Sequence, residues 1–235
     1  MENSSIITTK KLTKSFPMGK SLFTALESVD LSIGKGEFAG LIGPSGSGKT
    51  TLLNIIGSLD SPSSGKAMVL NQSIGDLTAK EAAKLRKESL GFIFQSYNLL
   101  AVHTVFENVE FPLLLLNYSA GQRKKMVMDA LEWVGLTDKV KSKPPQLSGG
   151  ECQRVAIARA MVKKPSLVLA DEPTANLDAA NSHNILQTME KLNQDLNTTF
   201  LFATHDEKVI NYLKRKIYLF DGKIADDERI TTQQS

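Results

Sequence analysis

Cysteine is almost absent from this sequence: Cys152 is the only one among 235 residues. One cysteine cannot form a disulfide within the chain, so nothing in the sequence requires an oxidising compartment. The segment Met1–Lys10 also lacks the apolar core with a basic flank that marks a secretory signal. We therefore expect a protein that folds without disulfides and carries no secretory signal in this segment.

Long hydrophobic runs are absent as well. Apolar runs such as Leu113–Leu116 are far shorter than the about 20 residues that a membrane-spanning helix needs. The sequence therefore predicts no membrane span. If the protein acts on a membrane, we expect it to do so from the aqueous side.

An excess of charge of one sign is the third absence. The chain has 28 basic and 25 acidic side chains, a formal net charge of +3. Proteins that bind nucleic acid usually carry a strong basic excess or a basic stripe, and we predict no nucleic-acid partner. With 41% hydrophobic and 23% charged residues, the composition is that of a globular protein with a packed core.

Short apolar strands alternate with helical patterns along the chain. Strands are predicted at residues 6–12, 25–33, 38–42, 66–70, 91–94, 166–170, 199–203, 216–220 and 223–225. Helices are predicted at residues 50–56, 78–88, 150–162 and 181–196, and residues 104–134 show only helical spacing. This alternation predicts an α/β fold with a mainly parallel sheet. The first two strands have the loose alternation of edge strands, and residues 104–134 form a small helical insert.

A glycine-rich loop follows the predicted strand 38–42. Gly43-Pro-Ser-Gly-Ser-Gly48-Lys49-Thr50 fits the pattern G-x-x-x-x-G-K-[ST] between a strand and a helix. The glycines let the backbone wrap a phosphate, and the loop N–H groups and helix N-terminus form an anion cradle. Lys49 adds a positive charge for the β and γ phosphates, and the Thr50 hydroxyl is a hard ligand for Mg²⁺. The loop predicts nucleotide binding.

Two acids end a second apolar strand. Leu167-Val-Leu-Ala170 is followed directly by Asp171 and Glu172. A buried strand that delivers carboxylates at its C-terminal end is what a Mg²⁺-nucleotide site needs. Asp171 can hold the metal through water, and Glu172 can orient or deprotonate the attacking water. By itself the pattern also fits a solvated strand end. It indicates a nucleotide site only because the phosphate loop is present in the same sequence.

A third segment identifies a family. Gln146–Ala160, with Leu147-Ser-Gly-Gly-Glu151 at its start, resembles the signature motif of ABC-type ATPases and lies shortly before the acidic strand, as in that family. With the loop and the acids, the resemblance covers nearly the full chain. Phe92–Leu100 and Glu107–Val109 resemble the group that includes macrolide exporters and lipoprotein-release transporters. The resemblance implies a P-loop NTPase fold with an antiparallel β edge and one domain over 1–235, in which about 96–160 form a helical subdomain.

The resemblance also implies roles for individual residues. Gln95 resembles the Q-loop glutamine, a Mg²⁺ ligand that also reports to the membrane subunit, and 175–178 resemble the D-loop at the dimer interface. His205 resembles the switch histidine at the γ phosphate, and Phe16 takes the place of an aromatic that stacks on adenine. The implied catalytic residues are Glu172 and His205, and the implied metal ligands are Thr50, Gln95 and Asp171. The implied nucleotide-binding residues are Phe16, Gly43, Pro44, Ser45, Gly46, Ser47, Gly48, Lys49, Thr50, Thr51, Gln95, Ser148, Gly149 and Gly150.

The function that the resemblance implies is an ATPase that powers a separate membrane permease. Two copies would bind two MgATP molecules head to tail, at the cytoplasmic face of the cell membrane, and drive integral-membrane permease subunits. We expect the permease to dock in the groove between the sheet domain and the helical insert, which begins at Gln95. Apolar and aromatic surface near it is supplied by Tyr97, Leu99, Leu100, Val102 and Phe106. For any single one of these residues, the alternative is packing in the core. An alternative is regulation of a membrane complex without transport, as in cell division. A soluble ABC-type ATPase of DNA repair or ribosomes is disfavoured by the single phosphate loop, and a nucleotide kinase by the signature segment.

Overall fold

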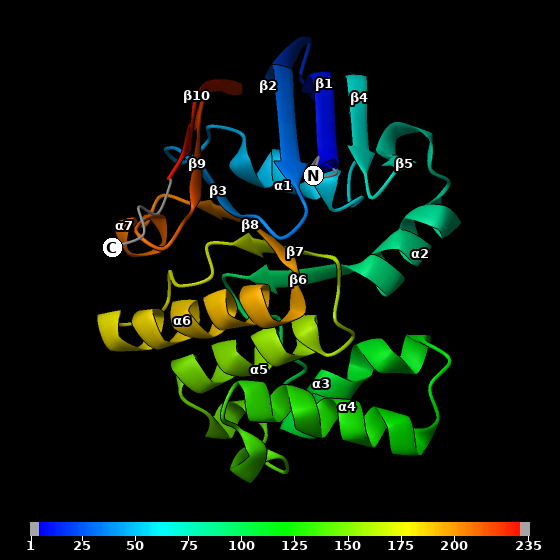
Figure 1. Ribbon diagram of the computed structural model, residues 1–235. Helices are drawn as coiled ribbons and strands as arrows, with labels where there is room; N and C mark the ends of the chain where they lie inside the picture. The colour runs from blue at the N-terminus through cyan, green and yellow to red at the C-terminus, as the bar shows by residue number, and fades with distance from the viewer. Residues whose placement is uncertain (1–4, 231–235) are drawn as a thin grey trace.

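The computed structural model describes residues 5–230. Part of the predicted signal-free segment, Met1–Lys10, and both ends of the predicted domain over 1–235 lie outside these residues. Two sheets make up the β structure: a six-stranded sheet of order β10-β9-β3-β8-β7-β6 and a four-stranded sheet of order β2-β1-β4-β5. Figure 1 shows β1, β2 and β4 at one end of the molecule, the central sheet in the middle, and helices α3, α4 and α5 at the other end.

The six-stranded sheet is mainly parallel, as predicted. Strands β9, β3, β8, β7 and β6 pair in parallel, and only β10 is antiparallel to its neighbour. The strands span β3 Phe38–Ile42, β6 Leu90–Phe94, β7 Leu167–Asp171, β8 Thr199–Thr204, β9 Arg215–Phe220 and β10 Lys223–Arg229. The turn between the last two strands was predicted at Asp221-Gly222, and both residues have positive φ, 45° and 75°, as a tight hairpin turn requires.

The four-stranded sheet is antiparallel throughout. Its strands are β1 Ser5–Met18, β2 Ser21–Gly34, β4 Ser64–Val69 and β5 Gln72–Ser73. The first two strands are longer than predicted, because the hairpin between them continues through Phe16 and Phe23 beyond the last alternating positions. The short strand β5 was not predicted.

The helices lie close to their predicted positions. They are α1 Lys49–Ile56, α2 Ala79–Ser89, α3 Val105–Glu110, α4 Ala120–Trp133, α5 Gly149–Met161, α6 Ala179–Leu196 and α7 Glu207–Ile210, with 3₁₀ turns at Ile74–Asp76, Phe111–Leu115, Thr137–Lys139 and Pro144–Gln146. Thr78 and Ser119 form capping boxes at the starts of α2 and α4. Pro112 converts the end of α3 into a 3₁₀ turn, because it cannot continue the helical hydrogen bonds. Helix α7 was not predicted.

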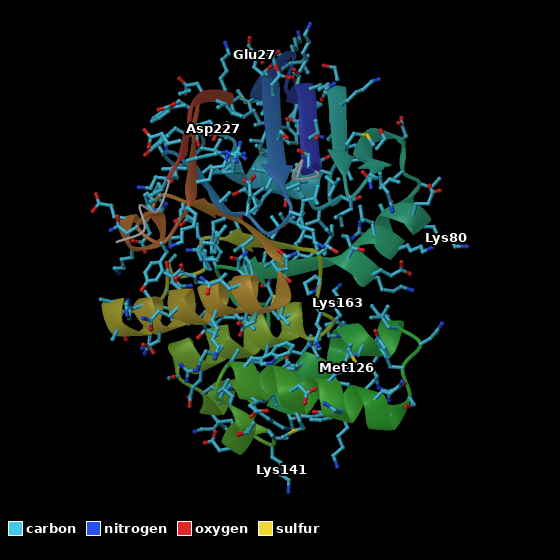
Figure 2. All side chains as sticks on the ribbon, in the orientation of Figure 1. Glu27, Lys80, Met126, Lys141, Lys163 and Asp227 are labelled. Carbon is cyan, nitrogen blue, oxygen red and sulfur yellow. The ribbon has the colours of Figure 1, made fainter. Side chains whose placement is uncertain are left out.

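Two hydrophobic cores cover the two faces of the central sheet. Successive residues of a strand point to opposite faces, and β8 shows the result: Phe200 and Phe202 belong to one core and Leu201 and Ala203 to the other. The first core is closed by helices α3 to α6, and the second by α1 and the antiparallel sheet. Figure 2, in the same orientation, shows this layering from Glu27 at one end to Lys141 at the other. Such two-sided burial explains why these strands read as continuous apolar runs.

Candidate nucleotide site

Four parallel strands end at one edge of the central sheet. The phosphate loop follows β3, Gln95 follows β6, Asp171 ends β7 and His205 follows β8. The register pairs Phe94 with Asp171 and Asp171 with Ala203, so these ends are level with one another. The carboxyl edge of an α/β sheet is where such folds bind ligands. The topology therefore brings together four segments that are far apart in the sequence.

The phosphate loop needs glycine at two points of close approach. A Cβ atom at Gly43 would lie 2.1 Å from the carbonyl oxygen of Leu219, and one at Gly48 would lie 2.6 Å from that of Ala25. Gly48 also has a φ of +103°, which L side chains rarely adopt. Any larger residue at either position would push the loop away from its supporting strands.

Lys49 is held against the loop that it follows. Its ammonium donates hydrogen bonds to the carbonyl oxygens of Gly43 at 2.6 Å and Pro44 at 2.9 Å. Burial lowers the pKa of Lys49, while the nearby charges of Glu172 and Asp171 oppose that shift. A buried ammonium beside a glycine-rich loop is positioned to accept an anionic phosphate.

Thr50 and Asp171 bring two oxygen-bearing side chains together. The Thr50 hydroxyl donates to the Asp171 carboxylate at 3.1 and 3.3 Å. Burial raises the pKa of Asp171, and the neighbouring charge of Glu172 raises it further, against the effects of Thr50 and Lys49. A cation bound here would relieve both unfavourable effects. Because Mg²⁺ prefers hard oxygens and keeps several waters and phosphate ligands, this small donor set fits it, and within residues 5–230 no cluster of three or more His, Cys, Asp or Glu side chains offers another site.

Glu172 and His205 contact each other across the ends of β7 and β8. Nδ1 of His205 lies 2.6 Å from one carboxylate oxygen of Glu172, and the Thr204 hydroxyl donates to the other at 3.0 Å. The Glu172 side chain is 15% exposed, whereas that of His205 is 60% exposed. The carboxylate is therefore oriented from within the protein, and the imidazole faces solvent at the rim of the site.

These residues line one cavity of about 490 Å³. Its lining contains Phe16, Phe23, Ala25, Ser45, Gly46, Gly48, Lys49, Thr50, Thr51, Gln95, Asp171, Glu172, Ala175 and His205. The lining combines charged groups with the two phenylalanines of the β1–β2 hairpin. Of the predicted residues, Gly43, Pro44 and Ser47 support the loop without lining the cavity.

The signature residues lie elsewhere in the same chain. Ser148 caps α5 and forms a capping box with Glu151, and neither Gly149 nor Gly150 lines the cavity. A Cβ atom at Gly150 would lie 2.5 Å from Asn181 of α6, so this glycine allows the two helices to pack closely. One chain thus assembles the phosphate loop, the acids and the histidine, but not the signature segment.

Contacts behind the site connect Gln95 to the signature helix. Arg159 of α5 donates to the carbonyl oxygens of Tyr97 at 2.7 Å and Asn98 at 2.6 Å, and both residues have positive φ, 59° and 49°. The Asn176 amide donates to the carbonyl oxygen of Gln95 at 2.9 Å. The turn after Gln95 is thereby held from two sides.

Sequence reasoning did not identify three contributors to this arrangement. Phe23 lines the cavity, Thr204 holds Glu172, and Arg159 holds the turn after Gln95. Only Phe23 had a signal in the sequence. Phe16 lies near the end of the first hairpin strand, and a hairpin places a residue a few positions further along the chain opposite it. The other two depend on tertiary contacts alone.

The sequence is similar to those of known ATP-binding proteins. The family described as ABC transporter matches residues 26–175. The lipoprotein-releasing system ATP-binding protein LolD of Pseudoalteromonas translucida is 45% identical over 223 residues, 95% of this chain and 96% of that protein. The macrolide export ATP-binding/permease protein MacB of Hyphomonas neptunium is 42% identical over 222 residues, 94% of this chain but 34% of its own length.

A solved structure shares the fold over 97% of the chain. The ATP-binding cassette MJ0796, in a dimeric post-hydrolysis state bound to ADP and Pi, matches with a TM-score of 0.88 and 41% identity, covering 97% of this chain and 100% of that one. The MJ0796 protein of Methanocaldococcus jannaschii is 42% identical over 229 residues, 96% of this chain and 97% of that protein. The phosphate-loop fold, with its mainly parallel sheet and its antiparallel strands, is therefore that of a known ATP-binding cassette.

Proposed function

The chain belongs to the ABC transporter family, and from that premise we propose how its own residues bind and hydrolyse ATP to drive a separate membrane permease. The observation that carries the proposal is the meeting of Lys49, Thr50, Asp171, Glu172 and His205 in one cavity at the carboxyl edge of the sheet. Together they offer groups to bind phosphate, to hold a metal ion and to activate water, which phosphoryl transfer requires. The protein is an ABC ATPase, and the assignment of roles to these residues is our inference.

Binding begins at the phosphate loop. The β and γ phosphates enter the cradle of N–H groups after β3, and the Lys49 ammonium exchanges its two carbonyl acceptors for phosphate oxygens. Thr50 and Asp171, with Gln95 at the cavity wall, are the oxygen donors that would hold Mg²⁺. The ion supplies charge neutralisation at the triphosphate when bound.

Hydrolysis needs a water in line with the γ phosphate. Glu172 accepts a proton from that water. The water oxygen attacks the γ phosphorus, and the bond between the γ phosphorus and the oxygen that bridges it to ADP breaks. Thr204 and His205 hold the Glu172 carboxylate, which keeps the base oriented. The products are ADP and inorganic phosphate.

A second copy completes each site. Ser148, Gly149 and Gly150 lie outside the cavity of their own chain, at the start of α5, a helix of 13 residues whose N-terminus is the positive end of its dipole. We infer that the partner's α5 N-terminus reaches the γ phosphate in a head-to-tail dimer. Hydrolysis then depends on closure of the dimer.

We take the helical insert to be part of a helical subdomain of about 96–160. The permease docks in a groove beside this subdomain. The groove has a volume of about 500 Å³ and is lined mainly by apolar side chains, with Phe92 and Phe94 from β6 and Phe111 and Leu115 from the segment after α3. Lys163, which is labelled in Figure 2, belongs to its lining. A cytoplasmic helix of the permease can place its apolar face there.

The groove differs in detail from the expected docking surface. Leu99 packs against the hydrophobic core, and Leu100, which is 37% exposed, does not line the groove. The groove nevertheless lies beside the turn after Gln95, since Asn98 and Arg159 belong to its lining. None of the helices described between residues 5 and 230 has the length and hydropathy of a membrane span. Membership of the ABC transporter family supports a place at the cytoplasmic face of the cell membrane, attached through the permease.

Mixing two variants tests the shared site. Lys49→Ala disables the phosphate loop, and Ser148→Arg obstructs the γ phosphate of the opposite chain. Head-to-tail sharing predicts that each variant alone is inactive in phosphate release, while the mixture contains heterodimers with one site carrying both defects and one carrying neither. Recovery of part of the wild-type rate supports the model. Normal hydrolysis by Ser148→Arg alone would show that the signature segment is not part of the site.

A further inference from the structure

One buried amide of α5 reaches the segment that follows Glu172. The side chain of Gln153 is fully buried, and its Nε2 donates to the carbonyl oxygen of Pro173 at 2.7 Å. A carbonyl oxygen can only accept a hydrogen bond, so the nitrogen is the end of the amide that faces it. The residue after Glu172 is thereby bonded to the helix that begins with the signature segment.

The other end of this amide is unpaired. Oε1 of Gln153 is buried and has no hydrogen-bond partner among residues 5–230. An unpaired buried acceptor lowers the free energy of unfolding, and an apolar side chain of similar shape avoids that loss. The other buried residues of α5 are glycine, cysteine or apolar: Gly150, Cys152, Val155, Ala156, Ile157, Ala158, Ala160 and Met161. Stability alone therefore does not explain an amide at this position, and a role in the neighbouring site does.

The backbone of Glu172 depends on support from its neighbours. Its φ of 45° is uncommon for a residue with a side chain and persists where the surrounding structure holds it. On the N-terminal side, its own N–H is bonded to the carbonyl oxygen of Ala203 at 2.9 Å. On the C-terminal side, Gln153 holds the carbonyl oxygen of Pro173. The bond from Gln153 is thus the contact by which α5 fixes the chain next to Glu172.

We propose that Gln153 is a positioning residue for ATP hydrolysis, whose bond to Pro173 keeps Glu172 in the conformation that directs its carboxylate at the attacking water. The inference rests on the proposed function, because it takes Glu172 as the base. Gln153 does not line the nucleotide cavity, so it acts through Glu172 and does not touch ATP. Without the bond, Glu172 relaxes towards an ordinary backbone conformation, and a misplacement of about 1 Å in a reacting group can slow a reaction by roughly 100-fold.

The alternative is that Gln153 only packs α5 against its neighbours. Asn193 of α6 offers a matched control, because its amide is also buried and donates to two backbone carbonyls, those of Gly36 at 2.9 Å and Thr198 at 2.7 Å. Gly36 and Thr198 precede β3 and β8, so this amide lies at the edge of the sheet opposite to the nucleotide cavity. Asn193→Leu is expected to lower the unfolding temperature and to leave the turnover of the folded chain unchanged.

The experiment compares the wild-type chain with Gln153→Met, Gln153→Leu and Asn193→Leu. The measurements are kcat for phosphate release, ATP affinity by calorimetry, and the temperature of thermal unfolding. Methionine keeps the length of the glutamine side chain but cannot donate to Pro173, and leucine is a second apolar replacement of different shape. Both Gln153 variants are expected to lose roughly 10- to 100-fold in kcat. Their ATP affinity is expected to stay unchanged, since no cavity residue is altered, and their unfolding temperature not to fall, since the unpaired acceptor is gone.

A double variant tests the route through Glu172. Residues that act as one unit have non-additive effects on the rate. Adding Gln153→Met to Glu172→Gln is therefore expected to slow single-turnover hydrolysis no further than Glu172→Gln alone. If the second change reduces the rate by its full factor again, Gln153 acts independently of Glu172 and the inference is wrong.

The remaining outcomes separate this inference from the proposed function. Wild-type kcat in both Gln153 variants overturns the inference, while slow hydrolysis by Glu172→Gln leaves the proposed function in place. A loss of kcat that comes with weaker ATP binding and a fall in unfolding temperature like that of Asn193→Leu marks a packing role and also overturns the inference. Normal hydrolysis by Glu172→Gln removes the proposed base, and the inference fails with it.

Discussion

Nδ1 of His205 lies 2.6 Å from Oε1 of Glu172. This contact joins the ends of two neighbouring strands, and the two residues are 33 positions apart in the chain. Glu172 itself has a φ of 45°, an uncommon conformation for a residue with a side chain, and its backbone N–H is bonded to Ala203 at 2.9 Å. Uncommon conformations of this kind persist where the surrounding structure holds them, often at functional sites. Glu172, the base that we propose, is thus held by its neighbours on β8.

Replacing Glu172 with glutamine tests its role as the base. Glu172→Gln keeps the size and most hydrogen bonds but removes the proton acceptor, so turnover is expected to fall by about 10²–10⁴-fold. ATP binding is expected to survive, and an ATP-bound dimer to accumulate on size-exclusion chromatography. Glu207→Gln, a change at an exposed acid of α7, serves as the control. Near-normal phosphate release by purified Glu172→Gln would remove Glu172 from the catalytic role.

Lys49→Ala removes the charge at the most anionic part of the substrate. Loss of a charge-assisted contact of about 1.5–3 kcal/mol or more is expected to weaken MgATP binding by at least about 10-fold. Lys66→Ala, which changes an exposed lysine of β4, should bind as the wild type does. Isothermal titration of both variants makes the comparison, and equal affinities would contradict the assignment of the loop.

Thr50→Val separates metal binding from phosphate binding. The hydroxyl contributes to the Asp171 pair, and valine has the same shape without the oxygen. We expect MgATP affinity to fall more than ATP affinity measured with a chelator present. The ratio of the two constants is the measurement, with wild type as reference. Equal losses in both conditions would argue against a metal role for Thr50.

Two adjacent leucines test the docking groove. Leu115 and Leu114 are 58% and 54% exposed, but only Leu115 lines the groove. Leu115→Asp is expected to lose co-purification with the detergent-solubilised permease, because apolar anchors in an interface contribute about 2 kcal/mol or more. Leu114→Asp is expected to retain it, and both variants should bind ATP normally. Equal recovery of the two variants with the permease would move the docking surface elsewhere.

Several elements were predictable because their signals are local. The run Phe38–Ile42 has the predicted boundaries, and the helix after the glycine loop begins at Lys49, one residue before its predicted start. The capping boxes at Thr78 and Ser119 depend on residues three positions apart. The extension of β1 to Met18 and the short helix Glu207–Ile210 were missed, since neither has a periodic pattern of its own and each is held by its neighbours.

The sequence by itself determined the chemistry available to this protein: an anion-binding loop with Lys49 and Thr50, an apolar strand ending in Asp171 and Glu172, and the family signature. These are short-range patterns, and backbone hydrogen bonding and side-chain polarity are enough to interpret them. Only the tertiary structure decided which groups meet. Parallel pairing levels the ends of β3, β6, β7 and β8, antiparallel pairing sets Phe23 opposite Phe16, and the packing of α5 on α6 leaves Ser148 outside the cavity of its own chain. The reason is that contacts between residues distant in sequence depend on burial of the whole core, which no local pattern encodes.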